Sequence, residues 1–419
     1  METRMRNEKK VSISRRDFLK NSAVAGTGLA LGAVGFPAVL RGAQPPEIPI
    51  GHLHPLSGSL AFDGQEMRKG LLLAVKEVNE AGGIKSLGGA KLKLLDADSE
   101  GKPELAISSM ERLAKSGAVA VVGCYQSSVT LVATQQAEKL RIPFVVSVAV
   151  ADEITARGFK YTFRIQPNSE QMASYTLKYL REIADAANTP IKTIAYLHDN
   201  TAFGQPLAAH VKQLAPKQGL ELILDVPYSP AAPDVTTEVG AIKASGADIV
   251  LDTGYFGDGV RVYKTMKDLR LQAKAVLGLA NGAFSHPKFV QELGSIAENV
   301  MDGNYHANPL SEITKRAFAN YKKEFNADMG SGTIFPYMAV YVIADALERA
   351  KSTKGEQLRE ALAKTDLKNH ILPQGPLVFG PDGQNVNAAP VIMQVQNGSV
   401  KVVWPVAYAD GKPIFPVSM

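Results

Sequence analysis

The 419-residue chain lacks several features that mark other classes of protein. Its single cysteine, Cys124, excludes an internal disulfide, and no cysteine stands near residue 40 to carry a lipid anchor. After residue 43, no apolar run approaches the ~20 residues that a bilayer-spanning helix needs. We therefore expect a soluble mature protein that is neither tethered by lipid nor embedded in a membrane.

An excess of positive charge is also missing from most of the chain. The net charge is +5, but residues 1–43 contain eight of the 46 basic residues and three of the 41 acidic ones. The remaining residues are balanced, with 38 basic and 38 acidic side chains. A neutral chain gives no electrostatic reason to expect a nucleic-acid partner.

Familiar enzyme motifs are absent as well. The sequence has no Gly-x-Ser-x-Gly, no His-Glu-x-x-His, no phosphate-binding Gly-x-x-x-x-Gly-Lys-Ser/Thr and no clustered Cys/His spacing, and its seven histidines are scattered. We expect no enzymatic activity, no cofactor and no metal. An enzyme stays open as the alternative, because a catalytic triad is brought together only by the fold.

The first 43 residues have the pattern of an export signal. Ser14-Arg15-Arg16-Asp17-Phe18-Leu19-Lys20 precedes a weakly apolar stretch from Ala23 to Leu40. A paired arginine before such a stretch is typical of a bacterial twin-arginine signal, so residues 1–43 are expected to direct export to the periplasm. An N-terminal amphipathic helix and an uncleaved anchor are the alternatives.

From Ile48 onward, short apolar strands alternate with longer helical stretches, and the alternation restarts after Pro167. This pattern predicts an α/β fold with parallel sheets. The chain also exceeds the about 250–300 residues of a single core, so two domains are expected. Expected strands are 48–53, 91–96, 118–122, 143–148, 193–197, 221–226, 248–252 and 274–277, and expected helices are 65–81, 103–116, 131–140, 170–186, 204–218, 235–245 and 259–270.

Ligands of such sheets bind beyond the carboxyl ends of the strands. This rule selects six loops before any resemblance is considered. They are residues 54–64, 123–130, 147–152, 198–206, 252–259 and 279–285.

Several strings resemble the leucine/isoleucine/valine-type periplasmic binding proteins. They include Pro55-Leu56-Ser57-Gly58, Glu77-Val78-Asn79-Glu80-Ala81-Gly82-Gly83-Ile84, Asp96-Ala97-Asp98-Ser99 and Leu197-His198-Asp199. The resemblance runs from about residue 48 to the C-terminus. It implies a type I periplasmic-binding-protein fold, with two Rossmann-like lobes joined by three hinge strands near 165–168, 305–308 and 390–394. The implied N-terminal lobe is 48–166 with 307–390, and the C-terminal lobe is 167–306 with 391–419.

The same resemblance suggests ligand-binding residues by position. The family's carboxylate-binding loop falls on Tyr125, Gln126, Ser127 and Ser128, where backbone N–H groups at a helix N-terminus form an anion seat. A second loop falls on Val148, Ala149 and Val150 and contributes backbone groups. From the other lobe, Phe203 and Tyr255 are expected to sandwich the ligand. In the alternative reading, the two serines only cap a helix and the aromatic residues only fill a core.

Two departures from the family bear on the ligand. Val150 stands where amino-acid binders of this family have threonine, and Ala280 or Asn281 stands where they have the acidic residue that holds the α-ammonium. Asp63 is the substitute candidate, although it can also be a plain helix N-terminal charge. We expect a carboxylate ligand with an apolar or aromatic body, with a hydrophobic or branched-chain amino acid as the second candidate.

The partner implied by the resemblance is the permease of an ABC importer, to which the chain delivers its ligand as a monomer. A periplasmic sensor that presents ligand to a signalling receptor has the same fold, and the sequence does not separate the two.

Overall fold

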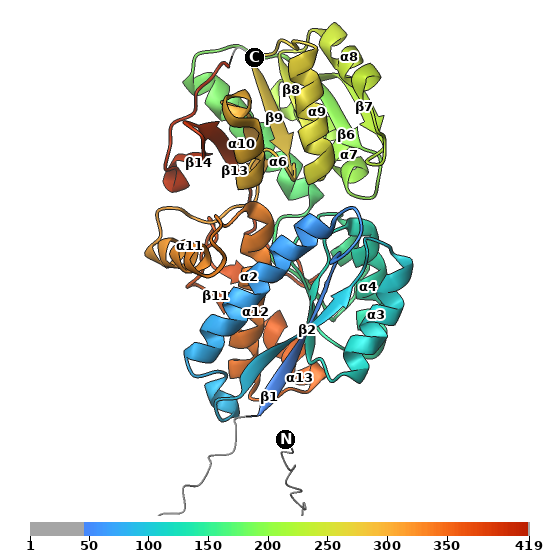
Figure 1. Cartoon of the computed structure of the whole chain (residues 1–419), viewed down its shortest axis with the longest axis vertical. Coiled ribbons are helices and arrows are strands. Elements are labelled where there is room, and N and C mark those ends of the chain that lie inside the picture. Colours follow the sequence, from blue (N-terminus) through green and yellow to red (C-terminus); the bar gives the residue numbers. More distant parts are fainter. Residues whose placement is uncertain (1–45, 418–419) are drawn as a thin grey trace, which may run out of the picture. The chain divides into compact units, whose positions relative to one another are not determined.

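Two mainly parallel β-sheets organise residues 46–417, the part of the chain that the computed structural model describes (Figure 1). The predicted export signal, residues 1–43, lies outside these residues. The first sheet has the strand order β2-β1-β3-β4-β5, and all its pairs are parallel. Its strands are β1 (Glu47–His54), β2 (Lys91–Asp98), β3 (Ala120–Gly123), β4 (Phe144–Val146) and β5 (Thr162–Arg164).

The second sheet has the order β14-β13-β10-β9-β8-β6-β7. Its strands β10, β9, β8, β6 and β7 pair in parallel, whereas β13 and β14 form an antiparallel edge. The strands are β6 (Thr193–Asp199), β7 (Glu221–Tyr228), β8 (Ile249–Thr253), β9 (Ala275–Leu279), β10 (Met301–Asn304), β13 (Val391–Gln396) and β14 (Ser399–Trp404); a separate pair is β11 (Asp366–Leu367) with β12 (Leu377–Val378).

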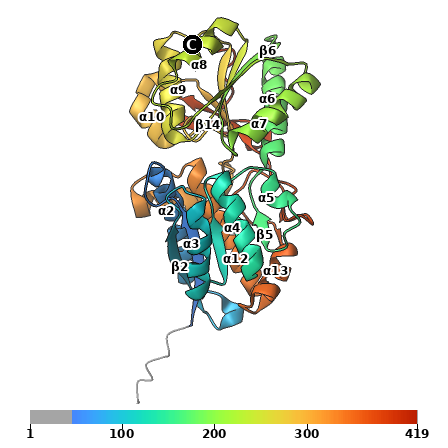
Figure 2. The same cartoon turned by 90° about the vertical axis from the view of Figure 1, so that its right-hand side faces the viewer.

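Helices pack around each sheet (Figures 1 and 2). We call the part built on the five-stranded sheet the N-lobe and the part built on the seven-stranded sheet the C-lobe. N-lobe helices are α2 (Ala61–Glu80), α3 (Glu104–Lys115), α4 (Ser127–Leu140), α5 (Glu153–Ala156), α11 (Glu312–Phe325), α12 (Ser331–Ala350) and α13 (Gly355–Ala363). C-lobe helices are α6 (Ser169–Ala186), α7 (Gly204–Leu214), α8 (Thr236–Ser245), α9 (Phe256–Asp268) and α10 (Pro287–Leu293).

Central strands are buried on both faces, which explains their continuous apolar sequence. Every residue of β3, β4, β8 and β9 is buried. Helix α12 is also largely buried and packs against α2. The apolar runs in the sequence therefore mark the middle of each sheet and the helix behind it.

The chain passes between the lobes three times. The first connection joins β5 to α6 and contains residues 165–168, and the second joins β10 to α11 and contains 305–308. The third was expected at 390–394, and this position is wrong: Val391–Gln396 is already a strand of the C-lobe sheet. The third connection therefore precedes residue 391, because Gln384 still bridges to Arg164 at the edge of the N-lobe sheet.

Three helices begin earlier than their apolar periodicity predicted. The expected starts at residues 65, 131 and 259 are at 61, 127 and 256 in α2, α4 and α9. The first turns contain glycine, serine and aspartate, which are typical of loops in sequence but also of helix starts. The loops after β1, β3 and β8 are consequently short, and the first turn of each helix lies next to the carboxyl end of its sheet.

One buried guanidinium joins the N-lobe sheet to the two segments beside it. Arg164, at the end of β5, is fully buried. It donates hydrogen bonds to Ala151 O (2.6 Å), Thr155 Oγ1 (3.1 Å) and Gln384 Oε1 (2.5 Å). Burial lowers the pKa of Arg164 to about 10, so the group stays charged at neutral pH. Strand β5, the 147–152 loop and the third connection are therefore held by one side chain.

Replacement of this side chain should cost much of the stability. In Arg164→Ala, the three acceptors lose their donor and a cavity remains, so we expect a loss of about 3–5 kcal/mol in the free energy of unfolding. Urea denaturation followed by circular dichroism measures it. The control is Arg112→Ala on the exposed face of α3, which should change stability by no more than about 0.5 kcal/mol. A loss in Arg164→Ala as small as in the control would contradict the role of this guanidinium.

Candidate ligand-binding site

A cavity of about 40 Å³ lies where the two lobes meet. This is room for a few water molecules, since one water needs about 10–15 Å³. A larger ligand therefore requires the lobes or the side chains to move apart. The lining residues are Asp63, Glu66, Met67, Tyr125, Val148, Ala149, Val150, Phe203, Gly254, Tyr255, Ala280, Asn281, Gly282, Ser285, His286, Asn304, Tyr305, Ser331 and Gly332.

Eight of the residues proposed from the sequence thus line one cavity, although they come from six separate segments. They are Asp63, Tyr125, Val148, Ala149, Val150, Phe203, Tyr255 and Asn281. The strand-end rule brings them together, because the carboxyl ends of both sheets face the same space.

Gln126, Ser127 and Ser128 are not part of that lining. They form the start of α4, where the Gln126 amide donates to Gly101 O (3.1 Å) and the Ser127 hydroxyl accepts from Ala151 N (3.4 Å). The alternative reading as serine caps also fails, since Gln126 is the N-cap and makes no side-chain capping bond. Ser127 instead connects α4 to the 147–152 loop.

Aromatic rings from both lobes form one continuous wall. Tyr125 of the N-lobe meets Tyr255 of the C-lobe edge-on at 5.2 Å between ring centroids, and Phe203 lies 5.2 Å from Tyr255 on the other side. Phe203 and Tyr255 are too close together for a ligand to lie between their rings. The expected sandwich is therefore replaced, in this arrangement, by a single aromatic surface against which an apolar ligand body can pack.

The 147–152 loop lines the cavity with residues 148–150 and has unpaired hydrogen-bond donors there. Its carbonyl oxygens are already engaged: Val148 O accepts from the Tyr305 hydroxyl, Ala149 O from Gln166, and Val150 O from Ser169. The N–H groups of Val148, Ala149 and Val150 have no acceptor among the described residues. A loop with occupied acceptors and free donors favours a negatively charged group of the ligand.

Asp63 is the carboxyl group of the cavity with the most perturbed proton affinity. It lies in the first turn of α2 and is 9% exposed. Burial raises its pKa to about 7, although a hydrogen bond from the Tyr125 hydroxyl and the charge of Lys288 act in the opposite direction. Asp63 is therefore partly protonated at neutral pH and able to donate as well as accept.

The sequence missed two buried carboxyl groups behind the cavity wall. Asp252 accepts from the Asn281 amide (2.6 Å), and Asp302 accepts from the Ser285 hydroxyl (2.6 Å) and the Asn304 amide (3.1 Å). Burial raises the pKa of Asp302 to about 7 and raises that of Asp252 strongly. The acidic residue that the family has where Ala280 or Asn281 stands is absent from this wall, but Asp252 lies directly behind Asn281 and contacts it. The sequence signal that could have found these two acids was their position within strands β8 and β10.

Ser331 and Gly332, at the start of α12, were also missed. They lie 26 residues after Tyr305, the nearest other lining residue in the sequence, and nothing local marks them. Their side of the cavity is closed by a hydrogen-bond contact between the Ser331 and Ser285 hydroxyls, 3.1 Å apart.

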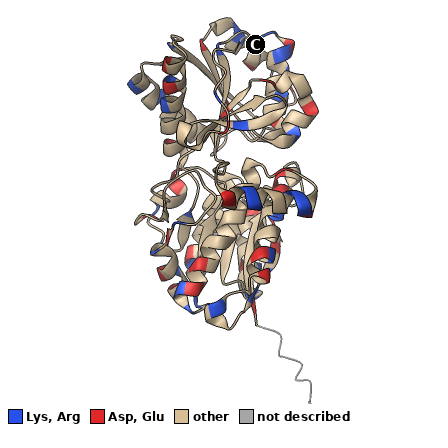
Figure 3. Cartoon of the chain, turned by 90° about the vertical axis from the view of Figure 1, so that its left-hand side faces the viewer, with Lys and Arg blue, Asp and Glu red and all other residues tan. Residues whose placement is uncertain are grey.

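No lysine or arginine is among the residues that line the cavity. Elsewhere, basic and acidic residues are interspersed along the helices on the side drawn in Figure 3. Within residues 46–417, none of the helices combines the length and hydropathy required to cross a membrane.

Known proteins share this architecture. The family model described as periplasmic binding protein matches residues 47–399. A Leu/Ile/Val-binding protein homolog 8 from Brucella suis is 29% identical over 401 residues, covering 93% of this chain and 97% of the relative. A homolog 7 from the same organism is 28% identical, covering 90% and 96%.

Solved structures agree on the fold. LivJ, a branched-chain amino acid transporter substrate-binding protein from Streptococcus pneumoniae in complex with isoleucine, has a TM-score of 0.74 at 22% identity, covering 88% of this chain and 100% of that one. An ABC transporter solute-binding protein from R. palustris in complex with benzoate has a TM-score of 0.72 at 18% identity, covering 87% and 98%. The predicted type I periplasmic-binding-protein fold is confirmed. The chain belongs to the periplasmic binding protein family, and its relatives include Leu/Ile/Val-binding protein homologs.

Proposed function

We propose that this chain is the extracytoplasmic solute-binding component of an ABC importer and that it captures a small carboxylate with an apolar or aromatic body. The observation that carries the proposal is the composition of the cavity. Residues 148–150, whose backbone N–H groups have no acceptor among the described residues, line the same cavity as the aromatic wall made by Tyr125, Tyr255 and Phe203. The first feature suits a carboxylate and the second suits its body.

Proteins of the same fold hold both candidate kinds of ligand. Besides the isoleucine and benzoate complexes, a solute-binding protein from Rhodopseudomonas palustris is complexed with 3,4-dihydroxybenzoic acid and one from Desulfitobacterium hafniense with leucine. The choice between an aromatic acid and an amino acid therefore depends on the residues of this chain.

A carboxylate fits these residues better than an amino acid does. Val150 offers no hydroxyl, and the wall at Ala280 and Asn281 offers no carboxylate for an ammonium group. The Asn281 amide is already directed to Asp252. Of the two carboxyl groups that line the cavity, Glu66 is paired with Lys69 (2.5 Å). Asp63, in its protonated form, donates a hydrogen bond to a ligand carboxylate instead of repelling it.

The amino-acid alternative uses the same residue in its other state. An ionised Asp63 accepts a hydrogen bond from an ammonium group, and that contact lowers its pKa. The two candidate ligands therefore require opposite protonation states of Asp63, which makes the proton balance of binding diagnostic.

Delivery to a permease, monomeric state, twin-arginine export and periplasmic location are parts of the proposal that rest on the family and on the sequence of residues 1–43. The lobe boundaries 48–166 with 307–390 and 167–306 with 391–419 also stay proposals. A periplasmic sensor is the alternative to an importer component. Ligand uptake by cells that lack the gene separates the two roles, because loss of an importer component stops uptake and loss of a sensor does not.

A matched ligand panel tests the cargo. Benzoate, 3,4-dihydroxybenzoate and 4-methylpentanoate should raise the melting temperature, because a ligand that binds only the folded state stabilises it by mass action. Phenylalanine, leucine and isoleucine should not, because their ammonium group would be desolvated without a partner. Thermal shift at equal concentrations gives the result. Stabilisation by the amino acids alone would refute the carboxylate proposal.

Proton exchange on binding tests the role of Asp63. At pH 7, carboxylate binding should take up about half a proton, since Asp63, with a pKa of about 7, is half protonated in the free protein and must be fully protonated in the complex. Titration calorimetry in phosphate and in Tris, whose ionisation enthalpies differ, measures this uptake. Affinity should accordingly weaken as the pH rises above about 7.

Asp63→Asn should retain carboxylate binding but lose the part of the uptake due to this residue. The matched control is Glu104→Gln, which removes an exposed carboxylate from the first turn of α3 and should leave the uptake unchanged. Proton release on binding, together with loss of affinity in Asp63→Asn, would show that an ammonium group occupies the site.

A further inference from the structure

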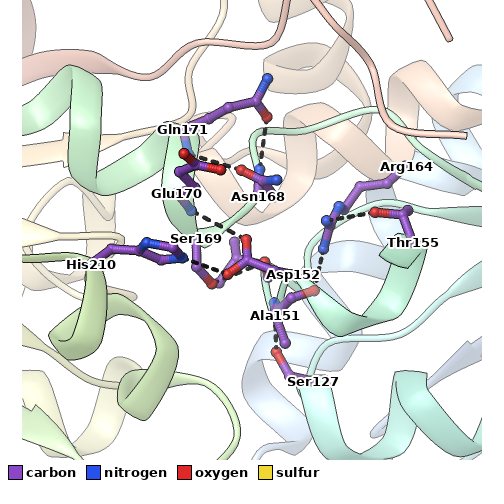
Figure 4. A network of polar contacts seen from close by, with 11 residues as sticks. Ser127, Ala151, Asp152, Thr155, Arg164, Asn168, Ser169, Glu170, Gln171 and His210 are labelled. Atoms are coloured by element: carbon purple, nitrogen blue, oxygen red, sulfur yellow. Dashed lines mark hydrogen bonds and ion pairs between the residues drawn. The ribbon is translucent and has the colours of Figure 1, made fainter. Parts of the chain in front are cut away.

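A histidine and an aspartate join the two lobes outside the ligand cavity. Asp152 lies at the start of α5 in the N-lobe, and His210 lies within α7 of the C-lobe. His210 Nε2 is 2.7 Å from Asp152 Oδ2 (Figure 4). Of the ion pairs among residues 46–417, this is the one that crosses from one lobe to the other.

The carboxylate of this pair is held in place from two sides. Asp152 also accepts from the backbone N–H of Glu170, in the first turn of α6 (3.2 Å). Its neighbour Ala151 is fixed by Arg164 (2.6 Å), as Figure 4 shows. The carboxylate is thus held by the N-lobe segment 151–152 and by the first turn of the C-lobe helix α6, and His210 meets it from the C-lobe helix α7.

The pKa shifts of both residues favour their charged forms, a protonated His210 and an ionised Asp152. The hydrogen bond that His210 donates to Asp152 raises the pKa of His210 more than burial lowers it. Burial alone would raise the pKa of Asp152, but the hydrogen bond and charge of His210 lower it on balance. The other charged groups that act on the pair are Glu170, which favours protonated His210, and Arg164, which favours ionised Asp152.

His210 makes this contact through one nitrogen. Nδ1 is buried and has no hydrogen-bond partner among the described residues. Asp152 is therefore the group whose direct contact stabilises the imidazolium. Separation of the lobes would take that contact away.

We propose that the Asp152–His210 pair is a latch that holds the lobes closed when His210 is protonated and releases them when it is neutral. The proposal goes beyond solute binding and does not depend on which ligand the cavity takes. Closed protein binds a proton at His210 more tightly than open protein does, so closure takes up a proton. The latch is engaged below the ordinary histidine pKa of 6.5 and is lost as the pH rises through the raised pKa of the closed form. In strong acid it is lost again when Asp152 is protonated.

Small-angle X-ray scattering of the protein without ligand tests the latch. The radius of gyration should be smaller at about pH 6 than at about pH 8.5, because protonated His210 shifts the equilibrium toward the closed form. In Asp152→Asn it should be the larger value at both pH values. The closed-to-open ratio at the lower pH should fall about two- to fivefold in the variant, the size expected of a partly exposed ion pair.

Asp225→Asn is the matched control. Asp225 pairs with His198 Nε2 at 3.0 Å, and both residues belong to neighbouring strands of the C-lobe. This variant also removes a His–Asp pair, but one that does not cross between lobes, so it should follow the wild-type protein at both pH values. Asp63 and Asp258, whose pKa values of about 7 and about 6 also fall in this range, are unchanged in both variants.

Three outcomes would overturn the latch. The first is a wild-type radius of gyration that does not change with pH. The second is the same pH response in Asp152→Asn as in the wild-type protein. The third is a response that disappears equally in Asp225→Asn, since this would assign it to a general effect of removing a carboxylate beside a histidine.

Discussion

The geometry of the site depends on one buried cation, Arg164. A guanidinium without contact to water must satisfy its donors within the protein. Here those donors reach the 147–152 loop, Thr155 and Gln384. The loop that lines the cavity, the segment that carries Asp152 and the connection that returns to the C-lobe are therefore fixed relative to the same strand.

This constraint explains why the 147–152 loop can serve as a donor surface. Its carbonyl oxygens accept hydrogen bonds from Arg164, Gln166, Ser169 and Tyr305. Since those acceptors are occupied, the N–H groups at 148–150 are the unpaired backbone groups of the loop. A loop held in this way needs little reorganisation when an anion binds, which is the advantage of a preorganised site.

Both lobes also contribute buried carboxyl groups whose pKa is raised. The cavity and its wall contain several buried carboxyl groups and no lysine or arginine among the lining residues. Burial raises the pKa of Asp63 and Asp302 to about 7, so both change charge close to neutral pH. A site of this kind adapts its charge to the ligand by exchanging protons, whereas a site with a fixed arginine would accept anions alone. Closure contacts outside the cavity, such as Asp152 with His210, add a proton-dependent term of their own.

The sequence by itself determined the alternation of strands and helices, the family and most of the cavity. Apolar strands and helical periodicity are local consequences of burial, and strand-end loops follow from the rule for parallel sheets. Tertiary structure decided the rest. It turned Ser127 away to the 147–152 loop, brought Ser331 to Ser285, and put Asp252 and Asp302 behind the wall. These relations join residues far apart in the chain, and hydrogen-bond geometry and burial arise only after the lobes have packed, so no local pattern records them.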